Sequence, residues 1–233
     1  MALPKIDVPI YELTLPSTGK TISYRPFLVK EEKILLMALE GEDQKEMIAA
    51  IKQIINNCVL EDNIEPRKLP LFDIEYILLN LRSRSMGNVI KTNYVHKDCK
   101  PVEIEIDVDT IEVKQNPEHK NKIELTDKIG VIMRYPDIGM MNMVDITGQK
   151  TEEVFDLVAK CIDQVYDEED FYGKGDYTTK ELKEFILNLT QDQFKKIEFF
   201  FSTLPKLSKE LKFRCSCGYT EDIVLEGLSN FFG

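Results

Sequence analysis

The chain has 233 residues, of which 43% are hydrophobic and 30% are charged, and its formal net charge is −11. This composition is typical of globular proteins, and the length is sufficient for one large domain or two small ones with a buried core. The acidic balance argues against nucleic acid as a partner, because proteins that bind phosphates usually carry a basic face.

The periodicity of apolar residues predicts an α+β fold, organised as a single composite domain over residues 1–233 with five consecutive sections. Residues 1–27 are expected to form a β-hairpin, because Leu13 and Leu15 alternate with polar neighbours before a Pro-Ser-Thr-Gly turn. Residues 28–87 form a helical section in which apolar residues recur at helical spacing. Its helices are expected at residues 29–39, 42–59 and 71–84.

Residues 88–146 change to a period of two and are expected to form a β section that contains a first metal turn. Its strands are predicted at residues 89–95, 102–113, 123–125 and 129–135. Along the second of these strands, carboxylates occupy every other position, at Glu103, Glu105, Asp107 and Asp109. Like charges so spaced indicate an exposed face and not an acid/base pair.

Residues 147–205 return to helical spacing, starting with a helix from Thr151 whose apolar stripe is expected to continue to Val165. Thr178 with Glu181, and Thr190 with Gln193, match the reciprocal capping pattern and predict two further helix starts. The acidic segment 167–176 does not fit a calcium-binding loop and is expected to be a solvated, mobile loop. Residues 206–233 are expected to form a C-terminal β-hairpin that contains a second metal turn, with strands at 209–214 and 219–225.

Four side chains at these two turns carry the clearest chemical signal. His96 and Cys99 form an H-x-x-C element, and Cys215 and Cys217 form a C-x-C-G element more than a hundred residues later. Three thiolates and one imidazole suit a tetrahedral Zn²⁺, as in the paired ligand turns of a zinc ribbon. Such a closed site holds structure together, and here it would join the middle section to the C-terminal strands.

The chain has five cysteines and two histidines, and three of these seven residues lie outside the two turns. Cys58 and Cys161 lie on apolar stripes of predicted helices and are expected in the core. His119 has only polar neighbours and is expected to be a solvated loop side chain. No secretory signal is apparent among residues 1–15, which favours a reducing compartment where cysteine pairs bind metal more often than they form disulfides.

An alternative interpretation needs no metal. His96 and Cys99 would then be ordinary turn residues, and Cys215 and Cys217 would be unpaired strand thiols. The C-x-C spacing is indeed tighter than the usual spacing of zinc-ligand pairs. With His96 assigned to a metal, no serine or cysteine nucleophile has a histidine partner, so the sequence predicts no catalytic residues and a protein that is not an enzyme.

The closing segment contains Phe231 and Phe232, which either cover the protein's own core or bind a neighbouring protein. Several segments together resemble the baseplate hub subunit family of T-even-type contractile-tailed bacteriophages. These segments are Pro9–Gly19 (PIYELTLPSTG), Tyr24–Lys33 (YRPFLVKEEK), the C-x-C-G element and Gly227–Phe232 (GLSNFF). The resemblance spans most of the chain.

The resemblance implies a structural or assembly protein of the tail baseplate hub that contacts other hub or tail proteins. It implies no nucleic acid, membrane or small-molecule partner. The protein would act in the cytoplasm of the infected bacterium, and both a permanent place in the virion and a role in assembly alone stay open. The alternative function is a zinc-ribbon adaptor that binds nucleic acid or the transcription machinery. Basic residues near the metal turns would support it, namely Lys97, Lys100, Lys212 and Arg214.

Overall fold

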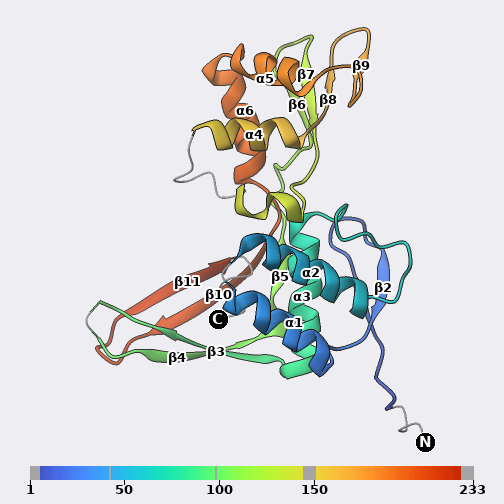
Figure 1. The fold of residues 1–233 in the computed structure, drawn as a ribbon. Helices are drawn as coiled ribbons and strands as arrows, with labels where there is room; N and C mark the ends of the chain where they lie inside the picture. The colour runs from blue at the N-terminus through green and yellow to red at the C-terminus, as the bar shows by residue number, and fades with distance from the viewer. Residues whose placement is uncertain (1–5, 42, 98, 144–150, 227–233) are drawn as a thin grey trace, which may run out of the picture. The chain divides into compact units, whose positions relative to one another are not determined.

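The structure is a computed structural model of the chain, and it describes residues 6–41, 43–97, 99–143 and 151–226. The chain forms two compact units. Unit 1 comprises Met1–Lys114 with Lys206–Gly233, and unit 2 comprises Gln115–Pro205. Each unit combines helices with antiparallel strands, so the α+β class is confirmed (Figure 1). The expected organisation as a single composite domain stays a prediction.

Unit 1 begins with the predicted hairpin and three predicted helices. Strands β1 (Tyr11–Thr14) and β2 (Thr21–Tyr24) pair antiparallel, with Leu13 opposite Ile22. The helices are α1 (Val29–Glu40), α2 (Gln44–Cys58) and α3 (Leu71–Met86). Their apolar stripes are buried as the spacing predicts, for example at Ile51, Ile54, Ile55, Cys58, Ile74, Ile77, Leu78 and Leu81.

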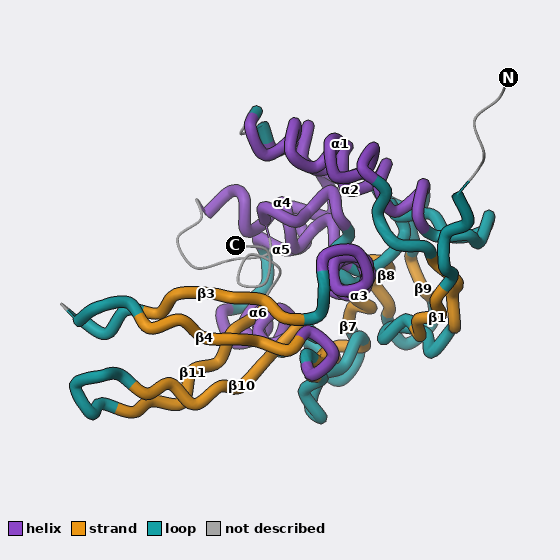
Figure 2. Tube along the Cα trace, turned by 90° about the horizontal axis from the view of Figure 1, so that it is seen from below, coloured by secondary structure: helices purple, strands orange, loops and turns teal. Residues whose placement is uncertain are grey.

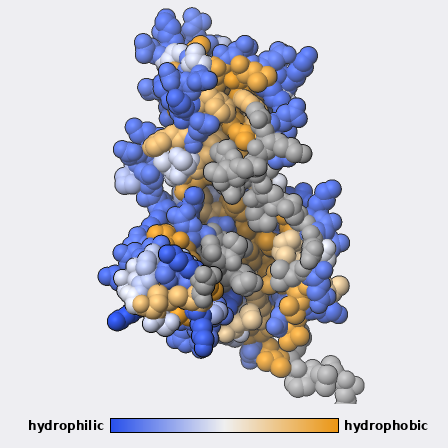
Figure 3. Space-filling model, turned by 90° about the vertical axis from the view of Figure 1, so that its left-hand side faces the viewer, coloured by the Kyte–Doolittle hydropathy of each residue, from blue (hydrophilic) through white to orange (hydrophobic). Residues whose placement is uncertain are grey.

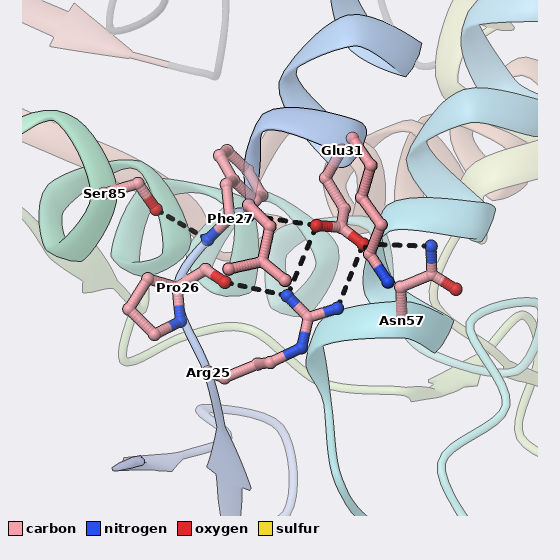
Figure 4. A network of polar contacts seen from close by, with 8 residues as sticks. Arg25, Pro26, Phe27, Glu31, Asn57 and Ser85 are labelled. Carbon is pink, nitrogen blue, oxygen red and sulfur yellow. Dashed lines mark hydrogen bonds and ion pairs between the residues drawn. The ribbon is translucent and has the colours of Figure 1, made fainter. Parts of the chain in front are cut away.

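A buried carboxylate anchors the start of α1. Glu31 is fully buried, and its oxygens accept hydrogen bonds from Arg25 Nη2 at 3.0 Å and Arg25 Nη1 at 3.3 Å (Figure 4). They also accept from the backbone N–H of Leu28 at 2.9 Å and from Asn57 Nδ2 at 3.2 Å. Because these donors come from the segment after β2, from the start of α1 and from α2, one side chain joins three parts of unit 1.

Burial by itself would raise the pKa of the Glu31 carboxyl group. The hydrogen bonds from Arg25 and Leu28, with the positive charges of Arg25 and Lys30, outweigh this effect and lower the pKa below its ordinary value. Glu31 is therefore ionised at neutral pH in spite of its burial.

We predict that Glu31→Gln destabilises the protein by about 3–5 kcal/mol at neutral pH, because it leaves the partly buried Arg25 guanidinium, which is 14% exposed, without its counter-charge. The folded-state pKa of Glu31 is lowered, so its contribution is complete above the unfolded-state pKa of about 4.3 and is lost as the pH falls through the folded value. Urea unfolding at neutral and at acidic pH measures both effects. The matched control is Glu32→Gln, at the exposed neighbouring position, and an equal loss in both variants would contradict the prediction.

The rest of unit 1 consists of two long hairpins and a short strand. Strand β3 (Val89–Tyr94) pairs with β4 (Val102–Asp107), and β10 (Lys206–Arg214) pairs with β11 (Thr220–Glu226) and with β5 (Glu112–Lys114). The expected single strand over 102–113 is wrong, because the 3₁₀ turn Val108–Thr110 separates β4 from β5. The Asp107 side chain accepts the backbone N–H of Asp109 at 3.1 Å, which favours a turn over a strand ladder.

The two hairpins lie side by side with their tips at the same end (Figures 1 and 2). They belong to different sheets, so they meet through side chains. The Tyr94 and Phe213 rings lie 4.6 Å apart, and Ile90, Ile106 and Leu207 share one core cluster with Leu79 of α3. The outward faces carry the charged residues, as expected: Glu103, Glu105, Asp107 and Asp109 are all exposed.

Unit 2 packs three helices against a four-stranded sheet in the order β6-β7-β8-β9. The strands are β6 (Lys122–Glu124), β7 (Gly130–Met133), β8 (Ile162–Tyr166) and β9 (Phe171–Tyr172), and a 3₁₀ segment covers Ile138–Met143. The helices are α4 (Thr151–Cys161), α5 (Thr179–Leu187) and α6 (Gln191–Ser202). Both predicted capping boxes are present, at Thr178 with Glu181 and at Thr190 with Gln193.

Two expectations for unit 2 are wrong in detail. The helix from Thr151 ends at Cys161, and Ile162 and Val165 instead belong to β8, where Val165 pairs with Val131 of β7. Pairing with a neighbouring strand outweighs the helical spacing that these β-branched residues continue. The segment expected to be only a loop contains β9, whose Tyr172 lies opposite Val165.

The expectation that His119 is a solvated side chain is also wrong. Its ring lies 4.9 Å from the Phe200 ring, and its Nδ1 lies 2.9 Å from Thr203 Oγ1. The Thr203 hydroxyl donates its single proton to the carbonyl of Phe199, so Nδ1 is the donor to Thr203. Burial lowers the pKa of His119, which keeps the ring neutral against the end of α6. Its polar sequence neighbours gave no sign of this contact.

Figure 3 shows hydrophobic side chains at the surface between predominantly hydrophilic ones. Exposed large apolar residues occur in both units, among them Val29, Leu36 and Met37 of α1 and Phe171, Leu187 and Phe199 of unit 2. Within the described ranges, no helix has the length and apolar character needed to cross a bilayer.

Candidate metal centre

The tip of the β3–β4 hairpin presents the first pair of predicted ligands. The backbone N–H of Cys99 donates to the carbonyl of His96 at 3.0 Å, which closes the chain into a tight turn. Lys97 within this turn has a positive φ of 50°. The turn thereby places the His96 and Cys99 side chains at one end of the hairpin.

The tip of the β10–β11 hairpin presents the second pair. The N–H of Cys215 donates to the Tyr219 carbonyl at 2.8 Å, and the N–H of Gly218 donates to the Cys215 carbonyl at 3.0 Å. Gly218 has a φ of 92°, a conformation that a side chain would disfavour, which explains a glycine directly after Cys217. Cys215 is buried and Cys217 is exposed.

The structure brings all four predicted ligands together. Their ligand atoms all lie within 4.8 Å of one another, although the two pairs are more than a hundred residues apart in the sequence. The Nδ1 atom of His96 lies 3.5 Å from Cys217 Sγ and 3.9 Å from Cys99 Sγ. The imidazole therefore faces the thiols through Nδ1.

The thiols of this cluster differ in pKa. The backbone N–H of Cys217 donates to the sulfur of Cys215 and, helped by hydrogen bonds from Cys217, Cys99 and His96, lowers the pKa of Cys215 to about 6. Hydrogen bonding to Cys215 and Cys217 raises the pKa of Cys99 to about 11. The lowered pKa favours loss of the proton from Cys215, and the thiolate is the form that binds metal.

An aromatic side chain that the sequence analysis did not identify supports the histidine. The Tyr219 ring stacks on His96 with centroids 3.9 Å apart and planes 4° from parallel. This contact fixes the plane of the imidazole across the two hairpins, as outer-shell contacts often do for metal ligands. The sequence gave no signal for it, because stacking depends on which hairpins are neighbours.

The donor set and its spacing fit a zinc ion. Bonds of about 2.3 Å to sulfur and about 2.0–2.1 Å to nitrogen place tetrahedral ligand atoms about 3.5–3.8 Å apart. The two distances from His96 Nδ1, 3.5 Å and 3.9 Å, are close to that range. The residues present can therefore hold such an ion with small adjustments of their side chains.

The remaining predicted residues lie elsewhere. Cys58 and Cys161 are fully buried, as expected, and burial raises the pKa of these thiols to about 11 and about 12, respectively. Neither is a metal ligand candidate in this arrangement. Phe231 and Phe232 lie outside the described residues.

Comparison with known proteins gives one match. Residues 8–233 match the family described as T4 bacteriophage base plate protein. No curated protein and no solved structure matches the chain. Because the match covers nearly the whole sequence, including both hairpin tips, the chain belongs to the T4 bacteriophage base plate protein family.

Proposed function

We propose that this base plate protein is a non-enzymatic structural or assembly component of the baseplate hub, and that His96, Cys99, Cys215 and Cys217 hold a structural Zn²⁺. The observation that carries the zinc assignment is the convergence of one imidazole and three thiols from two separate hairpin tips. The family membership supports the role in the phage tail. The hub assignment rests on the resemblance of the N-terminal motifs, the C-x-C-G element and the segment Gly227–Phe232 to hub subunits.

A structural role follows from the donor set. Four protein ligands complete a tetrahedral shell and leave no position for a water or a substrate. Zinc bound there would contribute charge neutralisation of the thiolates and a rigid connection between the tips. Because the site is complete only when the two tips meet, the binding free energy of zinc would stabilise the folded arrangement of the hairpins.

The surface of the hairpins favours protein contacts over nucleic acid. On the outward face of β3–β4, Lys91 lies 3.0 Å from both Glu103 and Glu105, so the basic residue is already paired with acid. On β11, Glu221 and Asp222 are exposed beside the second tip. A mixed, mainly acidic face suits charge-selective contact with protein partners and opposes binding to phosphates.

We expect the purified protein to contain about one Zn²⁺ per chain, measured by inductively coupled plasma mass spectrometry. Cys215→Ser should lose most of this zinc, because a serine hydroxyl replaces a thiolate ligand at the centre of the cluster. Cys58→Ala, at a buried cysteine outside the cluster, is the matched control and should retain the metal. A zinc-free wild type, or equal zinc in wild type and Cys215→Ser, would refute the metal assignment.

Removal of zinc should loosen the hairpins and leave unit 2 unchanged. We expect faster amide hydrogen exchange in residues 89–107 and 206–226 after chelation, because no strand ladder joins the described parts of these two hairpins. Exchange in α4, α5 and α6 serves as the internal control. Faster exchange throughout the chain would show that the metal supports the whole fold and not a local connection.

The hub assignment is tested by co-expression with other hub proteins followed by size-exclusion chromatography, where we expect co-elution. The double variant Phe231→Ala, Phe232→Ala should weaken this assembly more than it lowers the melting temperature, because aromatic residues without charged sequence neighbours are typical interface anchors. Equal losses of assembly and stability would assign both rings to the protein's own core. Elution of the wild type as a free chain would contradict the hub role.

A further inference from the structure

The three thiols at the hairpin tips differ in their access to solvent. Cys217 is exposed, Cys99 is half-buried and Cys215 is buried. A dissolved oxidant therefore reaches the sulfur of Cys217 first, since oxidation of a cysteine depends on its exposure. Cys58 and Cys161 are buried in the core and offer no such access.

Cys217 has two other thiols within a short distance, one on each hairpin. The Sγ atoms of Cys99, Cys215 and Cys217 all lie within 4.8 Å of one another, and Cys99 forms hydrogen bonds with both cysteines of the other tip. All three cysteines are free thiols in the structure. Rotation of two side chains between staggered positions brings sulfurs at such distances into the range of a disulfide bond.

Cys99 is the better bonding partner for Cys217. Cys215 is separated from Cys217 by Ser216 alone, so a bond between them would close a small ring in which disulfide geometry is hard to satisfy. The N–H of Gly218 also donates to the carbonyl of Cys215, which holds this turn in its present shape. A bond from Cys217 to Cys99 closes no small ring, because these residues are more than a hundred positions apart.

We propose that Cys99 and Cys217 form a disulfide bond between the two hairpin tips when hydrogen peroxide is the oxidant. The sulfur of Cys217 attacks one peroxide oxygen and breaks the O–O bond, and the hydroxide that leaves takes the Cys217 proton to become water. The product is a sulfenic acid at Cys217. The sulfur of Cys99 then displaces the hydroxyl group, which leaves with the Cys99 proton as a second water. Two thiols are thus oxidised to one disulfide, and one peroxide is reduced to two waters.

This disulfide and the proposed zinc exclude each other. Once Cys99 and Cys217 are bonded, His96 and Cys215 are the only members of the cluster left as ligands, which are too few for a closed tetrahedral site. Both states connect the tips: the metal in the reducing cytoplasm, and the disulfide in the oxidising surroundings that a virion meets outside the cell. The exchange between the two states rests on the proposed function, whereas the oxidation itself requires only the positions of the thiols.

The test treats the full-length protein with a small excess of hydrogen peroxide after removal of metal by EDTA. Remaining thiols are blocked with iodoacetamide, and tryptic peptides of the monomeric fraction are analysed by mass spectrometry without reduction. Trypsin places Cys99 as the single cysteine of the peptide 98–114, and both Cys215 and Cys217 in the peptide 215–233. We expect these two peptides to be linked, and the link to disappear after reduction.

Cys217→Ser should lose this link. Cys215→Ser is the matched control, because it makes the same change in the same turn, and it should keep the link; circular dichroism verifies that each variant is folded. The proposal would be overturned by the wild-type amount of link in Cys217→Ser, by a bond confined to the peptide 215–233, or by the absence of any disulfide in the oxidised wild type.

The zinc assignment is tested separately, on reduced protein that has met no oxidant. A wild type that lacks zinc but forms the link would refute the metal assignment and support the disulfide. A wild type that contains zinc but forms no link after chelation and oxidation would refute the disulfide alone.

Discussion

Among the residues that the structure describes, no strand ladder joins the β3–β4 hairpin to the β10–β11 hairpin, so side chains must hold the two together, and this constraint governs much of unit 1. At the base, the hairpins share a core cluster with Leu79 of α3. Just before the tips, Tyr94 packs against Phe213, and at the tips His96 stacks on Tyr219 beside three thiols. Apolar contact decreases toward the tips, where several inward side chains are only half-buried. A metal ion at that end would supply the connection that burial supplies at the base.

The buried Glu31 carboxylate likewise holds together parts of unit 1 that no strand ladder connects. The segment after β2 has little secondary structure of its own, and it is positioned by the hydrogen bonds of Arg25 to Glu31 and of Phe27 N–H to Ser85 Oγ (Figure 4). A second buried carboxylate, Asp73, accepts the backbone N–H of Ser17 at 3.0 Å and so holds the first hairpin turn against α3. Burial raises the pKa of Asp73 and its hydrogen bonds only partly offset this, whereas the Arg25 charge lowers the pKa of Glu31. The two acids are therefore unequal, and Glu31 depends on its cation.

Local sequence patterns were sufficient to predict most of the helices and strands. Capping residues Thr178 and Thr190 marked their helix starts because a cap is a contact between near neighbours in sequence. The ligand set could also be predicted from the sequence, since excluding the cysteines on apolar stripes leaves three cysteines and His96 at two predicted turns. The predictions were wrong where the structure depends on contacts between residues far apart in the sequence. Ile162 belongs to a strand because β8 pairs with β7, and His119 is partly buried because it contacts Thr203 at the end of α6. The role of Glu31 was missed for the same reason, because its partners Arg25 and Asn57 form no local motif with it.

The charge on the hairpins of unit 1 bears on how such a protein would assemble. Their exposed strand faces carry mainly acidic side chains. A surface of defined charge attracts one type of partner and repels others, which is a source of specificity more than of affinity. Rigid hairpins matter for the same reason, since a surface that is already ordered loses less entropy on binding. The side chains that link the hairpins would then act on assembly by fixing the contact surfaces in advance.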